Sequence, residues 1–182
     1  MKRKEEIKVT FIAYVWSMEE RKKIRKKENI CGEENIFFHV SLIKYESNGF
    51  FDQTTLPGNV GLCGKQTVPR SAAAFTTAVE QMLSDLRVAT PKINGFFAAA
   101  AEEKAAVGGG NVTVYGVAQC ARTVSSSGCL NCLQVAYANL QSCLPDAEGR
   151  AVDAGCFLRY SNTSFFADNQ TTNLDPFLNN GQ

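Results

Sequence analysis

The sequence predicts an α+β fold in which helices cover one face of an antiparallel sheet. Residues 111–119 alternate apolar and polar side chains and are rich in β-branched residues, a pattern typical of a strand. Two other segments carry apolar residues at helical spacing. Turn-linked strands near the C-terminal end favour an antiparallel sheet over a parallel one.

The first predicted helix begins after Ser71, a suitable N-cap, and stops at Pro91. Its apolar stripe consists of Phe75, Val79, Met82, Leu83 and Leu86. Asn94 and Gly95 then predict a turn. The apolar run at 96–101 that follows fits either a strand or a helix.

The second predicted helix spans residues 130–144, with Leu133, Ala136, Tyr137, Leu140 and Leu144 on its apolar side. Three glycines at 108–110 break the chain before the central strand at 111–119. A loop at 145–149 follows the second helix, and residues 150–161 are expected to form one strand.

Six of the seven cysteines predict a disulfide framework. Cys120, Cys129 and Cys132 are spaced C-x8-C-x2-C across the turn between the central strand and the second helix. At about 100° per residue, Cys129, Cys132 and Cys143 fall on one side of that helix. Cys63, Cys120 and Cys156 bring the number to six, for which sequence alone allows 15 pairings. Cys31 is left unpaired.

Composition excludes several functional classes. The chain has 182 residues and 45% hydrophobic content, enough for one domain or slightly more. Ten of the nineteen Lys and Arg lie in residues 1–30, so the rest of the chain is net acidic and is not expected to bind nucleic acid. No run approaches the ~20 apolar residues of a membrane span. The eight mostly apolar residues 9–16 make no convincing signal peptide.

An internal repeat indicates the domain organisation. Residues 40–55 parallel residues 155–172, with a basic residue and Tyr, then Phe-Phe, then Gln-Thr-Thr. We therefore expect residues 60–170 to be a complete domain and 37–59 to be the remnant of an upstream repeat plus a linker. Residues 1–36 are interpreted as a charged segment outside any domain, and 171–182 as a tail. On this interpretation the chain is a truncated tandem.

The residue types argue against catalysis. The single histidine, His39, lies far from any motif, and phosphate-binding loops, nucleophile elbows and kinase signatures are absent from the sequence. No cofactor or metal is therefore expected. Cys129-Leu-Asn-Cys132 could be a redox pair or half of a zinc site, but the other framework cysteines favour two structural disulfide halves. Sequons at Asn111, Asn162 and Asn169 indicate a secreted glycoprotein.

The cysteine pattern, with Tyr115-Gly-Val-Ala-Gln119 before it and Gly155-Cys-Phe-Leu-Arg-Tyr160 after it, resembles the plant cysteine-rich domain named after ginkbilobin. That domain occurs singly in secreted antifungal proteins and in pairs in the ectodomains of cysteine-rich receptor-like kinases. The resemblance implies two helices on an antiparallel sheet of about five strands. It also implies the disulfides Cys63–Cys143, Cys120–Cys129 and Cys132–Cys156.

The resemblance further implies a sugar site. In the antifungal members, mannose is held by three residues whose positions here are Gly64, Arg150 and Ser161. Arg150 alone matches, so mannose binding is not expected. We interpret the chain as a non-catalytic module at the cell surface or in the apoplast, which recognises an extracellular protein or cell-wall ligand in stress or defence signalling. It is also expected to associate with related domains. The alternative is a secreted mannose-binding antifungal protein.

Overall fold

The computed structural model describes residues 8–12, 42–46, 53–68, 72–105 and 111–178. For 8–12 and 42–46 the description is limited to the backbone. Several sequence-based expectations lie outside these residues, namely the Ser71 N-cap, His39, Cys31 and the glycine run at 108–110. Of the expected segments at 1–36 and 37–59, residues 1–7, 13–41 and 47–52 also lie outside them.

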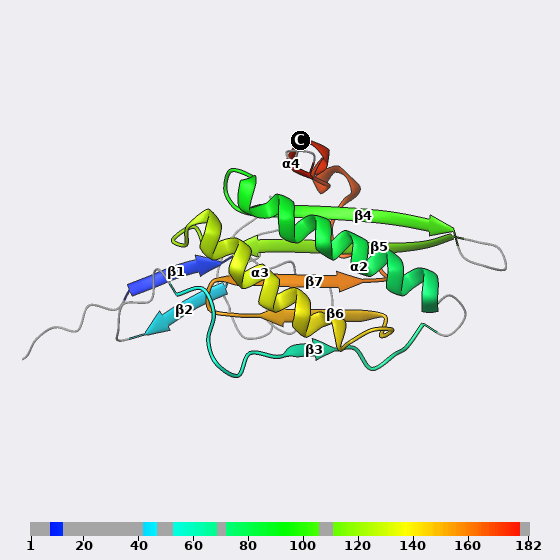
Figure 1. Ribbon diagram of the computed structural model, residues 1–182, viewed down its shortest axis with the longest axis horizontal. Coiled ribbons are helices and arrows are strands. Elements are labelled where there is room, and N and C mark those ends of the chain that lie inside the picture. The colour runs from blue at the N-terminus through cyan, green and yellow to red at the C-terminus, as the bar shows by residue number, and fades with distance from the viewer. Residues whose placement is uncertain (1–7, 13–41, 47–52, 69–71, 106–110, 179–182) are drawn as a thin grey trace, which may run out of the picture.

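A five-stranded antiparallel sheet with order β3-β6-β7-β5-β4 forms the centre of the molecule. The strands are β3 (Gly61–Cys63), β4 (Phe97–Ala105), β5 (Asn111–Cys120), β6 (Glu148–Val152) and β7 (Cys156–Ser161). Two long helices, α2 (Ala72–Ala89) and α3 (Ser126–Gln141), cover one face of this sheet (Figure 1). The predicted α+β fold is thus confirmed.

Short elements complete the described chain: the 3-10 helices η1 (Thr90–Lys92) and η2 (Asp168–Gln170), and the one-turn helix α4 (Asp175–Leu178). Apart from the main sheet, β1 (Lys8–Ile12) pairs with β2 (Leu42–Glu46) in an antiparallel ladder. Part of the expected N-terminal segment therefore pairs with part of the expected repeat remnant. The ambiguous run at 96–101 belongs to β4.

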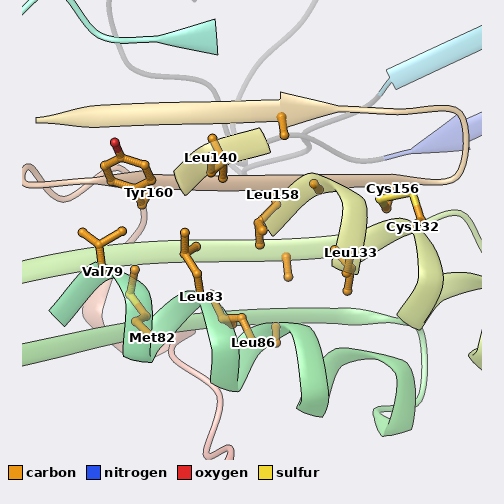
Figure 2. Close-up of a cluster of buried hydrophobic side chains, with 14 of the residues drawn as sticks. Val79, Met82, Leu83, Leu86, Cys132, Leu133, Leu140, Cys156, Leu158 and Tyr160 are labelled. Carbon is orange, nitrogen blue, oxygen red and sulfur yellow. A yellow bond between two sulfur atoms is a disulfide. The ribbon is translucent and has the colours of Figure 1, made fainter. Parts of the chain in front are cut away.

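The core lies between the helices and the sheet, as Figure 2 shows. All five residues of the predicted α2 stripe are buried, and Leu133, Ala136 and Leu140 of α3 are buried with them. Tyr137 and Leu144 are partly buried at the margin of this core. Gly116 on β5 lets α2 approach closely, because a Cβ there would lie 2.6 Å from the Met82 methyl carbon. The amphipathic patterns alone thus predicted the helix faces.

The expected strand at 150–161 is instead a hairpin, so that prediction was wrong. β6 and β7 pair antiparallel on either side of residues 153–155. Asp153 is 8% exposed, and its Oδ1 accepts hydrogen bonds from the backbone N–H groups of Ala154 (2.7 Å) and Leu56 (2.8 Å). The Asp153 N–H also donates to the Cys156 carbonyl at 3.0 Å, so both the backbone and the side chain of Asp153 stabilise this turn.

The same aspartate fastens residues 53–60, the expected linker, to the domain. The Asn59 amide donates to Asp153 Oδ2 and accepts a 2.8 Å hydrogen bond from the Asn139 amide of α3. The Thr54 carbonyl accepts from Gly155 N–H at 2.9 Å. The segment before β3 therefore packs against the hairpin and α3.

The expected C-terminal tail also contacts the sheet. The Thr172 N–H donates to the Ala99 carbonyl at 2.7 Å, and Ala99 N–H donates to Thr172 Oγ1 at 3.2 Å. Leu174 packs against the core beneath α2 and α3. Residues 171–174 thus cover part of the outer edge of β4.

Three disulfides join α3 and the residues after it to the sheet. Their pairs are Cys63–Cys143, Cys120–Cys129 and Cys132–Cys156, the pairs that the family resemblance implies. Cys129 and Cys132 of the C-x2-C motif therefore belong to two different disulfides rather than to one redox pair. Chain-entropy arguments assign each of the three disulfides roughly 2.7–4.5 kcal/mol of stabilisation. The largest value belongs to Cys63–Cys143, because it closes the longest loop.

We predict that the double substitution Cys63→Ala/Cys143→Ala lowers the free energy of unfolding by about 2–5 kcal/mol, because the unfolded chain gains the entropy of an open loop. Urea denaturation of the oxidised proteins measures the difference. Peptide mapping without reduction should show Cys63 linked to Cys143 in the parent protein. Reaction of all six framework thiols with maleimide in the native protein would contradict the disulfide framework.

Limited proteolysis should cut the chain before Gln53 and leave a resistant fragment that retains residues 53–60. Asp153→Ala should expose that segment to cleavage, since Leu56 and Asn59 then lose their acceptor. Mass spectrometry of the fragments gives the cut sites. Protection of residues 1–52 equal to that of the core would show that the N-terminal part packs as tightly as the domain.

Candidate functional site

The sheet face opposite the helices carries the polar side chains of interest. Side chains alternate between the faces along a strand. On β7, Cys156, Leu158 and Tyr160 lie in the core beneath the helices. Phe157, by contrast, belongs to a smaller cluster with Val117 and Phe165. We call the face that carries this second cluster the open face.

A groove of about 760 Å³ lies on the open face over β3, β6 and β7. It is lined by residues 62–66, 147–150, 159 and 161–165. Residues 62–66 come from β3 and the segment after it, residues 147–150 from the start of β6, and residues 159 and 161–165 from β7 and the segment after it. Sites for small ligands commonly enclose 300–1,000 Å³, so the groove has a suitable size.

The structure brings together the three positions that the family resemblance assigns to sugar binding. Gly64, Arg150 and Ser161 all line the groove. Arg150 is exposed, whereas Ser161 is 5% exposed and its Oγ accepts a 3.1 Å hydrogen bond from Thr163 N–H. A Cβ at Gly64 would lie 2.9 Å from Glu148 Cγ. An Asn side chain there would therefore require Glu148 to move.

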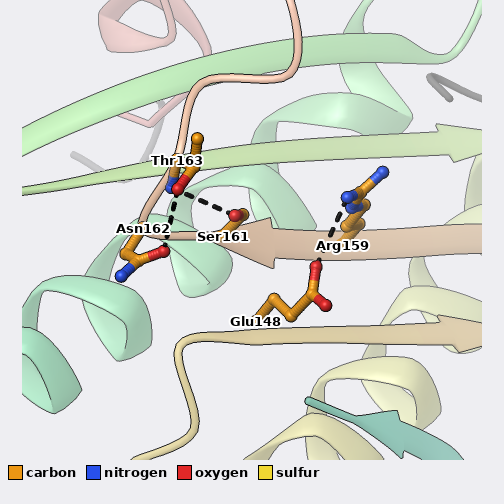
Figure 3. Close-up of polar contacts among 5 residues, drawn as sticks. All are labelled: Glu148, Arg159, Ser161, Asn162 and Thr163. Carbon is orange, nitrogen blue, oxygen red and sulfur yellow. Dashed lines mark hydrogen bonds and ion pairs between the residues drawn. The ribbon is translucent and has the colours of Figure 1, made fainter. Parts of the chain in front are cut away.

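An ion pair at the floor of the groove is shown in Figure 3. Arg159 Nη2 lies 3.5 Å from Glu148 Oε2, with side chains 11% and 56% exposed. The Arg159 guanidinium also stacks over the Phe165 ring at 4.3 Å from its centroid. Arg159 is thus held in place by charge on one side and by an aromatic face on the other.

Sequence reasoning missed Glu148 and Arg159 as groove residues. Arg159 belongs to the motif that carries the family resemblance. Because side chains alternate along a strand, its place between Leu158 and Tyr160 could have predicted that it lies on the opposite face of the sheet. Its contact with Glu148, however, depends on how β6 and β7 pair, which requires the hairpin at 153–155.

Tyr160 supports the groove from the other side of the sheet. Its hydroxyl donates a 3.1 Å hydrogen bond to the Asp146 carbonyl, in the loop before β6. Burial raises the pKa of Tyr160 well above its usual value, and the nearby Asp146 and Glu148 charges act in the same direction. The hydroxyl therefore stays protonated and keeps the loop in position.

A second hollow of about 730 Å³ lies by β4, β5 and the C-terminal segment. Asp85, Glu102 and Asp175 contribute carboxylates to its lining. Burial raises the pKa of Glu102, while Lys104 lowers it. Within the described residues, no three His, Cys, Asp or Glu side chains are grouped so that they could hold a metal ion.

The three sequons lie at different places on the molecule. Asn111 begins β5, Asn162 follows β7 and lines the groove, and Asn169 lies in η2. All three side chains are exposed. In the part of the chain that the structure describes, no helix has the length and apolar character needed to cross a membrane.

Comparisons with known proteins agree with this fold. Residues 62–163 match a family described as "Salt stress response/antifungal". Cysteine-rich receptor-like protein kinase 46 of Arabidopsis thaliana is 30% identical over 132 residues, which cover 71% of this chain and 20% of that protein. Cysteine-rich receptor-like protein kinase 2 of the same plant is 33% identical over 131 residues, or 71% of this chain and 19% of the kinase. The chain thus spans about a fifth of the length of these kinases.

Antifungal protein ginkbilobin-2 of Ginkgo biloba is 33% identical over 104 residues, which cover 57% of this chain and 74% of that protein. Among solved structures, the tandem DUF26 ectodomain of the Arabidopsis thaliana cysteine-rich receptor-like protein PDLP8 is similar, with a TM-score of 0.51 and 20% identity. The similarity covers 69% of this chain and 54% of that one. The matched family and the shared fold confirm the resemblance: the chain belongs to the salt stress response/antifungal family, whose cysteine-rich domain is named after ginkbilobin.

Proposed function

We propose that this chain is a non-catalytic extracellular recognition module that binds its ligand in the groove of the open face. The observation that carries the proposal is the position of the groove. It is lined by β3, β6 and β7, and disulfides on the opposite face join β7 to α3 and β3 to Cys143, two residues after α3. A rigid scaffold beneath a solvent-facing polar groove suits binding without chemistry.

The extracellular location is supported by the disulfides and by the relatives. Disulfides persist in oxidising compartments such as the cell exterior. Cysteine-rich repeat secretory protein 38 of Arabidopsis thaliana is 28% identical over 127 residues. Secretion would make the exposed amides of Asn111, Asn162 and Asn169 acceptors for N-glycosylation.

A role in stress or defence signalling is supported by the family description and by the receptor-like kinase and antifungal relatives. The ligand would be an extracellular protein or a cell-wall component, and association with related domains would fit the tandem arrangement of the ectodomain of PDLP8.

The second candidate function is that of a mannose-binding antifungal protein. It is favoured by Arg150 on the groove wall and by the similarity to ginkbilobin-2. Gly64 and Ser161 argue against it. Gly64 lacks a side-chain amide, and Ser161 offers one hydroxyl where the antifungal members have a carboxylate.

Blocking the groove tests the main proposal. Leu62 of β3 and Val60, one residue before that strand, are 49% and 62% exposed, but Leu62 lines the groove and Val60 does not. Leu62→Trp should therefore remove binding to an array of cell-wall oligosaccharides and extracellular plant proteins, and Val60→Trp should preserve it. Binding that both substitutions reduce equally, or that neither changes, would contradict a groove-based function.

Mannose binding should be undetectable at millimolar sugar. Gly64 and Ser161 lack the amide and the carboxylate that the antifungal members have at these positions. Relative to those members, this is expected to cost roughly 2–4 kcal/mol of binding free energy, or about 30- to 1,000-fold in affinity. Calorimetric titration of the oxidised chain with mannose measures this. A saturable signal that Arg150→Ala abolishes would restore the lectin function.

A further inference from the structure

One of the three glycosylation sequons lies in the wall of the groove. Asn162 is a lining residue, whereas Asn111 and Asn169 are not. Its side chain is exposed, which leaves room for a glycan. Figure 3 shows Asn162 beside Ser161, where β7 ends. A glycan on Asn162 would therefore start at the surface that we assign to ligand binding.

Hydrogen bonds fix this attachment point. The Asn162 N–H donates to the Ala147 carbonyl at 2.9 Å, which ties residue 162 to the segment before β6. The Asn162 side-chain oxygen Oδ1 accepts a 3.1 Å hydrogen bond from Thr163 Oγ1. The Asn162 amide nitrogen, to which a glycan is joined, has no partner among the residues that the structure describes. The root of a glycan is thus held against the wall that contains residue 147.

The sequon at Asn162 differs from the other two in its third residue. It reads Asn-Thr-Ser, whereas those at Asn111 and Asn169 read Asn-Val-Thr and Asn-Gln-Thr. Sequons that end in Ser are glycosylated less completely than those that end in Thr, because the Thr methyl group adds contacts with the transferase. A secreted preparation should therefore contain molecules with and without a glycan on Asn162.

The folded structure makes this difference permanent for each molecule. The transferase must bind the hydroxyl of Ser164, the third residue of the sequon. In the folded domain, Ser164 Oγ donates a 2.7 Å hydrogen bond to the Phe166 carbonyl. Thr163 N–H is also engaged, with Ser161 Oγ at 3.1 Å. The sequon must therefore be modified before the domain folds, and an unmodified molecule stays unmodified.

We propose that a glycan on Asn162 closes the groove, so that glycosylation at this position decides whether the module binds its ligand. The groove encloses about 760 Å³, and an N-linked glycan is bulky enough to cover its opening. Molecules without this glycan bind, and molecules with it do not. Glycans on Asn111 and Asn169 start outside the groove and leave it open. This inference rests on the proposed function and adds a regulation of the same groove.

The reactivity of Lys65 tests the closure without any ligand. Lys65 is exposed and lines the groove, whereas Lys92 is exposed in η1 and does not. Protein secreted from a glycosylating host is treated with a bulky amine-reactive biotin ester, and peptide mapping measures the labelling of each lysine. Lys65 should lose labelling where Asn162 carries a glycan, and labelling of Lys92 should stay the same.

Two substitutions change the occupancy of Asn162 in opposite directions. Ser164→Thr keeps the hydroxyl and creates an Asn-x-Thr sequon, so it should raise the occupancy and lower the labelling of Lys65. Asn162→Gln removes the sequon and should raise the labelling. Asn169→Gln is the matched control, because it removes a glycan outside the groove and should change neither lysine.

The array of cell-wall oligosaccharides and extracellular plant proteins gives the functional result. The parent protein is separated into molecules that bind an arrayed ligand and molecules that do not, and both fractions are mapped for glycopeptides. The bound fraction should lack the Asn162 glycan and the unbound fraction should carry it. This comparison involves no substitution in the groove wall. Disulfide mapping and thermal unfolding show that both fractions are folded.

The outcomes separate the closure from the function beneath it. An Asn162 that carries no glycan in either the parent or the Ser164→Thr protein would overturn the inference, as would equal labelling of Lys65 with and without the glycan. If Leu62→Trp removes binding but both fractions carry the Asn162 glycan equally, the closure is wrong and the recognition function stands. If Lys65 is protected but Leu62→Trp affects no arrayed ligand, the closure is confirmed and the recognition function fails.

Discussion

The attachment of α3 to the sheet is the constraint on which the rest of the structure depends. One end of every described disulfide lies on α3 or two residues after it, and the other ends lie at the end of β3, the end of β5 and the start of β7. The helix is thereby linked covalently to three of the five strands. α2, in contrast, is held by side-chain packing and by the close approach at Gly116. Reduction would therefore remove the covalent links of α3 and leave both helices held by side-chain packing alone.

This arrangement separates the two faces of the sheet by role. The helix face holds the disulfides and the larger core, so substitutions there carry the cost of cavities and lost packing. The open face has the smaller cluster around Phe157 and Phe165 and also the polar groove, in which Glu148 and Arg150 are exposed. Exposed side chains along the groove, such as Leu62 and Arg150, can change at little cost to stability. A family with this scaffold can therefore alter its ligand while keeping its fold.

The sequence predicted local features better than features that depend on distant contacts. The helix stripes were correct because amphipathic spacing is a property of adjacent turns. The hairpin at Asp153 was missed because the groups that it binds, Leu56 N–H and the Asn59 amide, lie 97 and 94 residues away. The family resemblance, and not any local pattern, indicated that Gly64, Arg150 and Ser161 lie together, because a family shares a fold and therefore its distant contacts. The ion pair of Glu148 and Arg159 could not be predicted, because it follows from the register of β6 and β7.

The bonds between Thr172 and Ala99 have a consequence for how the chain emerges from the ribosome. β4 is a nine-residue edge strand that begins with Phe and four alanines, a sequence able to pair with a second unfolded chain. Its protecting segment is synthesised more than 70 residues later. During that interval, the charges of Glu102, Glu103 and Lys104 are what discourage such pairing. A nascent chain thus passes through an aggregation-sensitive stage that ends when its C-terminal residues reach the sheet edge.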